Sequence, residues 1–167
     1  MDANSNIFLS VARGFNQGGC NLNLGLAPDS KNNNLYYDPE FLTNYEVGFN
    51  SQFFDSKMDI AAAIFYSDRQ DQQVLISTQV DPTDPNTFSF LTQNAAEGIN
   101  KGLELNVDMQ LNESLHYFAR FGLLKTEINN WKSRPDLDGR AQAHAPEKSY
   151  ALGLDWFVTE RASLSID

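Results

Sequence analysis

Hydrophobic and polar residues alternate one by one along most of this chain. Between residues 41 and 53, the odd positions carry Phe, Thr, Tyr, Val, Phe, Ser and Phe, whereas the even positions carry Leu, Asn, Glu, Gly, Asn and Gln. Successive side chains of a β-strand point to opposite faces, so this pattern predicts a strand with one apolar and one polar face. Residues 103–111 show the same alternation even more regularly.

The alternation returns in further segments, so that the sequence predicts six or seven strands in all. These segments lie at residues 7–11, 58–66, 115–123, 149–156 and 162–167. They share no repeated consensus, and no linker or low-complexity tail divides the chain. We therefore expect one all-β domain over residues 1–167, an antiparallel up-and-down meander in which each strand pairs with the next.

The segments between the predicted strands are of two kinds. Three are short and polar, as in hairpin turns: Asp55-Ser56-Lys57, Asn112-Glu113-Ser114 and Thr159-Glu160-Arg161. Three are long, at residues 14–38, 78–87 and 129–146. Because the two kinds alternate, we expect the short turns at one end of the sheet and the long loops at the other. Outer-membrane barrels have this asymmetry.

Composition narrows the class of protein. The formal net charge of −10 at pH 7 argues against a nucleic-acid partner, because neutralising phosphates requires an excess of Lys and Arg. No apolar run approaches the roughly 18–20 residues that a membrane-spanning helix requires. A transmembrane barrel strand needs only about 9–11 residues of alternating character, so a barrel remains open.

Residue types typical of enzyme and metal sites are few and scattered. The single cysteine, Cys20, lies in a stretch rich in Gly and Asn, and the two histidines, His116 and His144, have no second ligand at metal-binding spacing. We therefore expect no enzyme activity, no cofactor and no metal site.

Several short stretches resemble TonB-dependent outer-membrane receptors, and they occur in that family's order. Residues 10–19 read SVARGFNQGG and resemble SRGFKxGG, and residues 38–49 resemble PExxxNYExG. Further stretches are similar to later strands of the family, at residues 61–66, 71–74, 94–96, 101–105 and 145–156. The resemblance covers nearly the whole chain.

This resemblance implies a barrel of 22 strands with a plug domain in its lumen, of which this chain would supply about seven strands. The family lies in the outer membrane of Gram-negative bacteria and most often imports ferric siderophores by energy-coupled transport. The implied partners are membrane lipid, the plug domain, the energy-transducing protein TonB and a siderophore-like ligand. We expect the plug, the TonB-contacting segment and the other strands to lie outside this chain.

The resemblance also sorts polar residues into two groups of candidates. The first is expected to face the lumen and the plug: Glu46, Asn50, Gln52, Glu104, Asn106, Asp108, Arg120 and Asp155. The second comprises aromatic and basic residues of the loops that could hold an anionic metal chelate: Arg13, Tyr36, Tyr37, Trp131, Lys132, Arg134, Arg140 and His144. Polar residues that are simply exposed to water would show the same pattern, so the role of both groups is a hypothesis.

Two other classes of protein remain open at this point. A passive porin also has long outer loops, but its barrel has about 16–18 strands and an open channel. A soluble β-rich binding module would need only the alternation and exposed loop aromatics.

Overall fold

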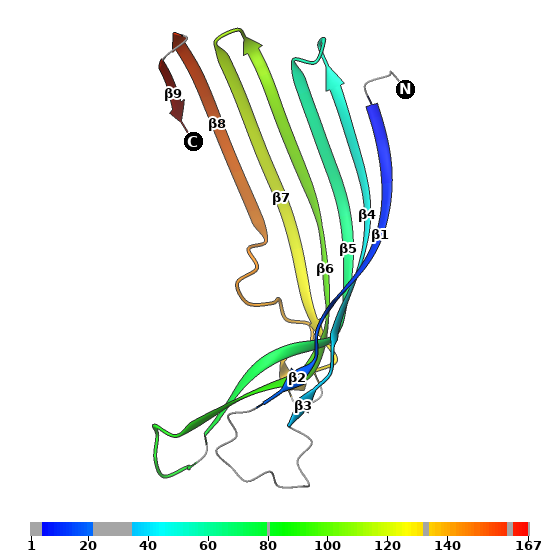
Figure 1. Ribbon diagram of the computed structural model, residues 1–167, viewed down its shortest axis with the longest axis vertical. Coiled ribbons are helices and arrows are strands. Elements are labelled where there is room, and N and C mark those ends of the chain that lie inside the picture. Colours follow the sequence, from blue (N-terminus) through cyan, green and yellow to red (C-terminus); the bar gives the residue numbers. More distant parts are fainter. Residues whose placement is uncertain (1–4, 22–34, 80, 132–133, 160–161, 167) are drawn as a thin grey trace.

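Seven strands form one antiparallel sheet. A computed structural model describes residues 5–21, 35–79, 81–131, 134–159 and 162–166. The strand order is β1-β4-β5-β6-β7-β8-β9, so each strand of this sheet pairs with the one that follows it (Figure 1). This order confirms the predicted meander. The strands are β1 (Ser5–Asn16), β4 (Glu40–Phe53), β5 (Met58–Gln79), β6 (Phe88–Asn112), β7 (Leu115–Asn129), β8 (Lys148–Thr159) and β9 (Ala162–Ile166).

Short and long connections lie at opposite ends of the sheet, as predicted, and residues 160 and 161 of the third short turn lie outside the described residues. β4, β6 and β8 end at the top of Figure 1, where β5, β7 and β9 begin, and the three long connections leave the opposite end. The first long connection contains a separate two-stranded sheet of β2 (Gly19–Cys20) and β3 (Tyr36–Tyr37). The third contains a single turn of 3-10 helix, Pro135–Leu137.

β5 and β6 are much longer than the segments that alternation identified. Their pairing changes register between Arg69 and Gln73, and Asp71 has a φ of 54°. Such a β-bulge interrupts the alternation of side chains between the two faces. Beyond the bulge, both strands bend away from the main sheet (Figure 1). Regular alternation therefore did not identify the outer parts of the two strands, residues 73–79 and 88–94.

The register gives the main sheet one apolar and one polar face. Directly opposite residues share a face, and Val47 of β4 is opposite both Leu9 and Ile64. Ile64 is in turn opposite Leu103. We call the face that carries Val47 the apolar face, and the face that carries Glu46 the polar face.

In the part of the chain that the structure describes, no second layer covers the apolar face of the sheet. Among the described residues, Ala96 is the one hydrophobic residue that is buried, whereas Leu9 and Val11 are 80% and 72% exposed. An apolar sheet face normally packs against another element, and extended exposed apolar surface is rare on soluble monomers. In the described part of the chain, no helix is long and apolar enough to cross a membrane.

Three phenylalanines on the polar face each lie over a glycine of the neighbouring strand. The directly opposite pairs are Phe8 with Gly48, Phe65 with Gly102, and Phe118 with Gly153. A Cβ atom on Gly102 would lie 2.7 Å from Cζ of the Phe65 ring and 2.3 Å from the backbone oxygen of Leu123. The ring of Phe65 therefore occupies space that a side chain on Gly102 would need.

We expect Gly102→Ala to destabilise the folded protein. The added methyl group must displace both the Phe65 ring and the backbone at Leu123, and overpacking of this kind costs about 2 kcal/mol. Denaturant titration would measure the free energy of unfolding. Gly14→Ala is the matched control, because a Cβ there meets no atom within 4 Å. Equal losses in the two variants would contradict the steric explanation.

Candidate functional site

The eight residues expected to face a lumen occupy alternate positions on the polar face. Glu46, Asn50 and Gln52 lie in β4; Glu104, Asn106 and Asp108 lie in β6; Arg120 lies in β7 and Asp155 in β8. The register joins several of them into rows that run across the strands. In one such row, Asn50 is opposite Ala61, Ala61 is opposite Asn106, and Asn106 is opposite Arg120. The polar face is thus a continuous surface of hydrogen-bonding groups.

A charged network crosses three strands of the polar face near the short turns. Arg120 Nη2 donates to Asp108 Oδ1 at 2.8 Å, and Arg120 Nη1 donates to the backbone oxygen of Val107 at 3.0 Å. His116 lies between two carboxylates, with Nε2 3.8 Å from Asp108 Oδ1 and Nδ1 3.4 Å from Asp155 Oδ2. The side chains of Asp108, His116, Arg120 and Asp155 are 31–39% exposed, so they remain accessible to a polar partner.

An open depression of about 470 Å³ lies beside this network. Its polar lining includes Asn6, Asn50, Gln52, Asp59 and Asp108. These side chains offer both hydrogen-bond donors and acceptors to a polar partner. No group of three or more potential metal ligands occurs among the described residues.

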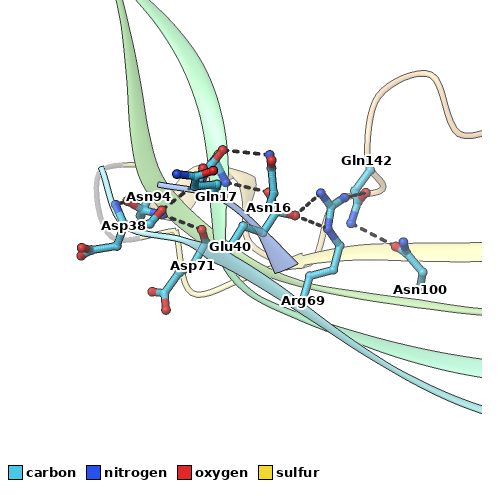
Figure 2. Close-up of polar contacts among 10 residues, drawn as sticks. Asn16, Gln17, Asp38, Glu40, Arg69, Asp71, Asn94, Asn100 and Gln142 are labelled. Atoms are coloured by element: carbon cyan, nitrogen blue, oxygen red, sulfur yellow. Dashed lines mark hydrogen bonds and ion pairs between the residues drawn. The ribbon is translucent and has the colours of Figure 1, made fainter. Parts of the chain in front are cut away.

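A second polar cluster surrounds the bulge of β5, at the end of the sheet where the long connections begin (Figure 2). Glu40 is only 8% exposed and forms an ion pair with Arg69. The Nε atom of Arg69 also donates to Glu40 Oε1 at 2.9 Å, and the backbone N–H of Gln73 donates to Glu40 Oε2 at 3.1 Å. One buried carboxylate therefore binds both the guanidinium group and the backbone at the register shift.

Asn94 of β6 connects the bulge to the first long connection. Its Oδ1 accepts from the backbone N–H of Asp38 at 2.6 Å, and its Nδ2 donates to the backbone oxygens of Asp38 and Asp71, at 2.8 Å each. The Nε2 atom of Gln73 donates to the backbone oxygens of Gln17 and Asp38, at 3.0 and 3.1 Å. Both ends of the first long connection are thus held at the bulge (Figure 2).

Gln142 brings the third long connection to the same place. Its backbone N–H donates to Thr126 Oγ1 at 2.8 Å, its Nε2 donates to Asn100 Oδ1 at 3.1 Å, and its Oε1 accepts from Arg69 Nη1 at 3.4 Å. Gly98 leaves room for this side chain, since a Cβ there would lie 2.9 Å from Gln142 Nε2. We call Glu40, Arg69, Gln73, Asn94 and Gln142 the bulge cluster.

None of the five residues of the bulge cluster was predicted as a site residue. Glu40 follows Asp38-Pro39 at the start of a predicted strand, and Arg69 and Gln142 lie outside the regular alternation. A carboxylate directly before a strand and an arginine directly after the next strand are a weak signal for a cross-strand ion pair. Only the strand register shows that the two side chains can meet, because it places Arg69 opposite Leu42, two residues from Glu40.

The candidates of the first long connection are divided between two places. Tyr36 and Tyr37 form β3, where the hydroxyl of Tyr37 lies 2.5 Å from the Cβ position of Gly19. Arg13 lies in β1 on the apolar face and not in a loop. Its guanidinium carbon is 4.5 Å from the centre of the Phe41 ring, a cation–π contact that holds it beside β4.

The remaining candidates belong to the third long connection: Trp131, Lys132, Arg134, Arg140 and His144. Lys132 lies outside the described residues. Arg134 donates two 2.9 Å hydrogen bonds to the carboxylate of Asp136, and these bonds lower the pKa of Asp136 below its ordinary value. The backbone oxygen of Arg140 accepts from Ile128 at 2.8 Å, which fixes the base of this connection. The ligand role of these residues stays a prediction.

Comparison with known proteins decides the family. The family model for the TonB dependent receptor-like β-barrel matches residues 2–165. This chain belongs to the TonB-dependent receptor family. A relative named "Probable TonB-dependent siderophore receptor PiuA", from Acinetobacter baumannii, is 30% identical over 132 residues, which cover 78% of this chain and 16% of the relative. TonB-dependent receptors are transport receptors and not enzymes.

Two solved structures of receptors share the fold. The ferric yersiniabactin uptake receptor FyuA from Yersinia pestis gives a TM-score of 0.71 at 17% identity, over 99% of this chain and 23% of that protein. The ferric preacinetobactin receptor BauA from Acinetobacter baumannii gives 0.65 at 18% identity, over 98% of this chain and 22% of that protein. The seven-stranded sheet therefore has the fold of part of a receptor barrel, and its own edges are not joined.

We expect Glu40→Gln to destabilise a TonB-dependent receptor barrel that contains this segment. The charge of Arg69 would lose its buried partner, which should lower the free energy of unfolding by about 2 kcal/mol. Urea titration of the refolded barrel would measure this loss, and hydrogen exchange should be faster at the Gln73 amide. Asp136→Asn is the matched control, because it removes an exposed partner of Arg134 and should leave stability unchanged. Equal effects would contradict the assignment.

Proposed function

We propose that this chain forms part of the wall and the extracellular loops of an outer-membrane receptor. The receptor imports a ferric siderophore, or a similar scarce nutrient, by energy-coupled transport. The observation that carries this proposal is the family match over residues 2–165. Support for the ligand class comes from the name of PiuA and from the ferric siderophores named for FyuA and BauA.

The exposed apolar face supports a place in the outer membrane. Exposed residues of this face, such as Leu9, Val47 and Ile64, need a cover, and the acyl chains of lipids supply one. Strands in lipid must also satisfy their backbone groups on both edges. In the complete receptor, further strands of the barrel would pair with β1 and β9.

The polar face would then line the lumen and hold the plug domain. Its carboxylates, amides and Arg120 can exchange hydrogen bonds and ion pairs with a polypeptide that fills the barrel. TonB would act on the plug and not on these strands. The aromatic and basic candidates of the long connections would contact an anionic metal chelate outside the membrane by stacking and charge.

The orientation of the two faces predicts different environments for Val47 and Asn50. Val47 should contact lipid and Asn50 should face the lumen, because their side chains lie on opposite faces of β4. Spin labels at the two positions in the reconstituted receptor should differ in accessibility to oxygen, which concentrates in the bilayer. Equal oxygen accessibility at the two positions would contradict this assignment of the two faces.

Energy-coupled uptake predicts a growth requirement under iron limitation. A strain that lacks the receptor should fail to grow on its ferric siderophore as the only iron source, and a strain that lacks TonB should fail equally. A panel of purified ferric siderophores identifies the ligand, and growth restored by excess ferric salt is the control. Uptake that persists without TonB would favour a passive channel over a receptor.

A further inference from the structure

Three lysines gather on the apolar face near the long connections. Lys101 lies in β6, Lys125 in β7 and Lys148 at the start of β8. Lys101 is directly opposite Lys125. Lys148 is directly opposite Leu123, which is two residues from Lys125 on the same face of β7. The three ammonium groups therefore come from adjacent strands and adjacent rows of one surface.

This arrangement of charge is unfavourable in the chain alone. Like charges directly opposite each other on neighbouring strands destabilise a sheet. All three lysines are exposed, and none of them forms an ion pair with a described carboxylate. The lining of the same depression holds the three lysines and Glu147, and Asp68 and Glu127 lie in the next row of this face. An external anion would remove the repulsion.

The surface beside the lysines is apolar. The lysines line an open depression of about 520 Å³, and its side toward the short turns is formed by Ile64, Leu103 and Leu123. Cations at one edge of an apolar depression match an amphiphile with a charged headgroup and hydrocarbon chains. A small free anion would leave the apolar part of the depression uncovered.

Tyrosines in the same row place the lysines at the boundary of the membrane. Tyr45 is opposite Tyr66, Tyr66 is opposite Lys101, and Lys101 is opposite Lys125. The two tyrosine rings lie 6.5 Å apart and are 49% and 40% exposed. Tyrosine is enriched at the level of lipid headgroups, where its ring can contact hydrocarbon and its hydroxyl can form hydrogen bonds with polar groups. This step rests on the membrane placement proposed above.

We propose that Lys101, Lys125 and Lys148 form a binding site for the phosphorylated headgroup of a lipid in the outer leaflet. The lysines bind the phosphate, and the acyl chains of the lipid lie along Ile64, Leu103 and Leu123. Basic clusters at a membrane surface bind anionic headgroups in this way, and each lysine contributes roughly a fivefold increase in affinity. The bound lipid neutralises the opposed lysines and covers the wall where β8 begins.

Native mass spectrometry of the complete receptor in detergent micelles tests this site. The probe is phosphatidic acid, and phosphatidylcholine and inorganic phosphate are the comparison ligands. Lys125→Gln should weaken the binding of phosphatidic acid about fivefold, and substitution of all three lysines should weaken it further. Lys125→Arg should retain binding. Lys57→Gln, which removes an exposed lysine in a short turn, is the matched control and should bind like the unaltered receptor.

The possible results distinguish a failure of the proposed lipid site from a failure of the proposed location in the membrane. Equal binding by the Lys125→Gln and Lys57→Gln variants, or equal binding of phosphatidic acid and phosphatidylcholine, would overturn the site alone. Displacement of the lipid by inorganic phosphate at similar concentration would also overturn it, because the apolar part would then contribute nothing. A receptor that remains in solution without detergent and binds none of these lipids would overturn both proposals.

Discussion

Backbone hydrogen bonding between neighbouring strands is the interaction on which the rest of this structure depends. The sheet is a single layer, and side-chain burial contributes little to it, since Ala96 is the one described hydrophobic residue that is buried. Register therefore matters more than packing. A shift of one residue would exchange the two faces of a strand, moving Val47 to the polar side and Glu46 to the apolar side. In a membrane, that exchange would place the Glu46 carboxylate among acyl chains, which is energetically unfavourable.

The bulge of β5 interrupts this ladder of hydrogen bonds. Side chains there form hydrogen bonds with the backbone N–H and C=O groups that the neighbouring strand leaves unpaired. Glu40 accepts from the backbone N–H of Gln73, and Asn94 donates to the backbone oxygen of Asp71. A buried carboxylate is stable here because Arg69 lies against it. The interruption also allows β5 and β6 to leave the direction of the sheet and extend into the second long connection (Figure 1).

The parts of the fold that the sequence predicted are those that depend on local periodicity. Alternation between residues 41 and 53 identified the two faces of β4, and the different lengths of the connections identified the two ends of the sheet. The bulge, the Glu40–Arg69 ion pair and the contact of Phe65 with Gly102 depend on residues between 21 and 37 positions apart. Such contacts leave no local pattern in one sequence. The family resemblance predicted that the strands belong to a barrel. Only the strand register shows that Lys101 and Lys125 are opposite each other.

The bulge cluster has a consequence for how the loops can move. Asn94 holds Asp38 of the first connection, and Gln142 of the third connection contacts Arg69. Both contacts lie at the bulge, beyond which the outer parts of β5 and β6 lead to the second connection. The three loops therefore have one common root, although they are far apart along the chain. A rearrangement of the first connection that reaches Asp38 has to break hydrogen bonds of both Asn94 and Gln73. At their bases, the loops behave as one mechanical unit and not as three separate flaps.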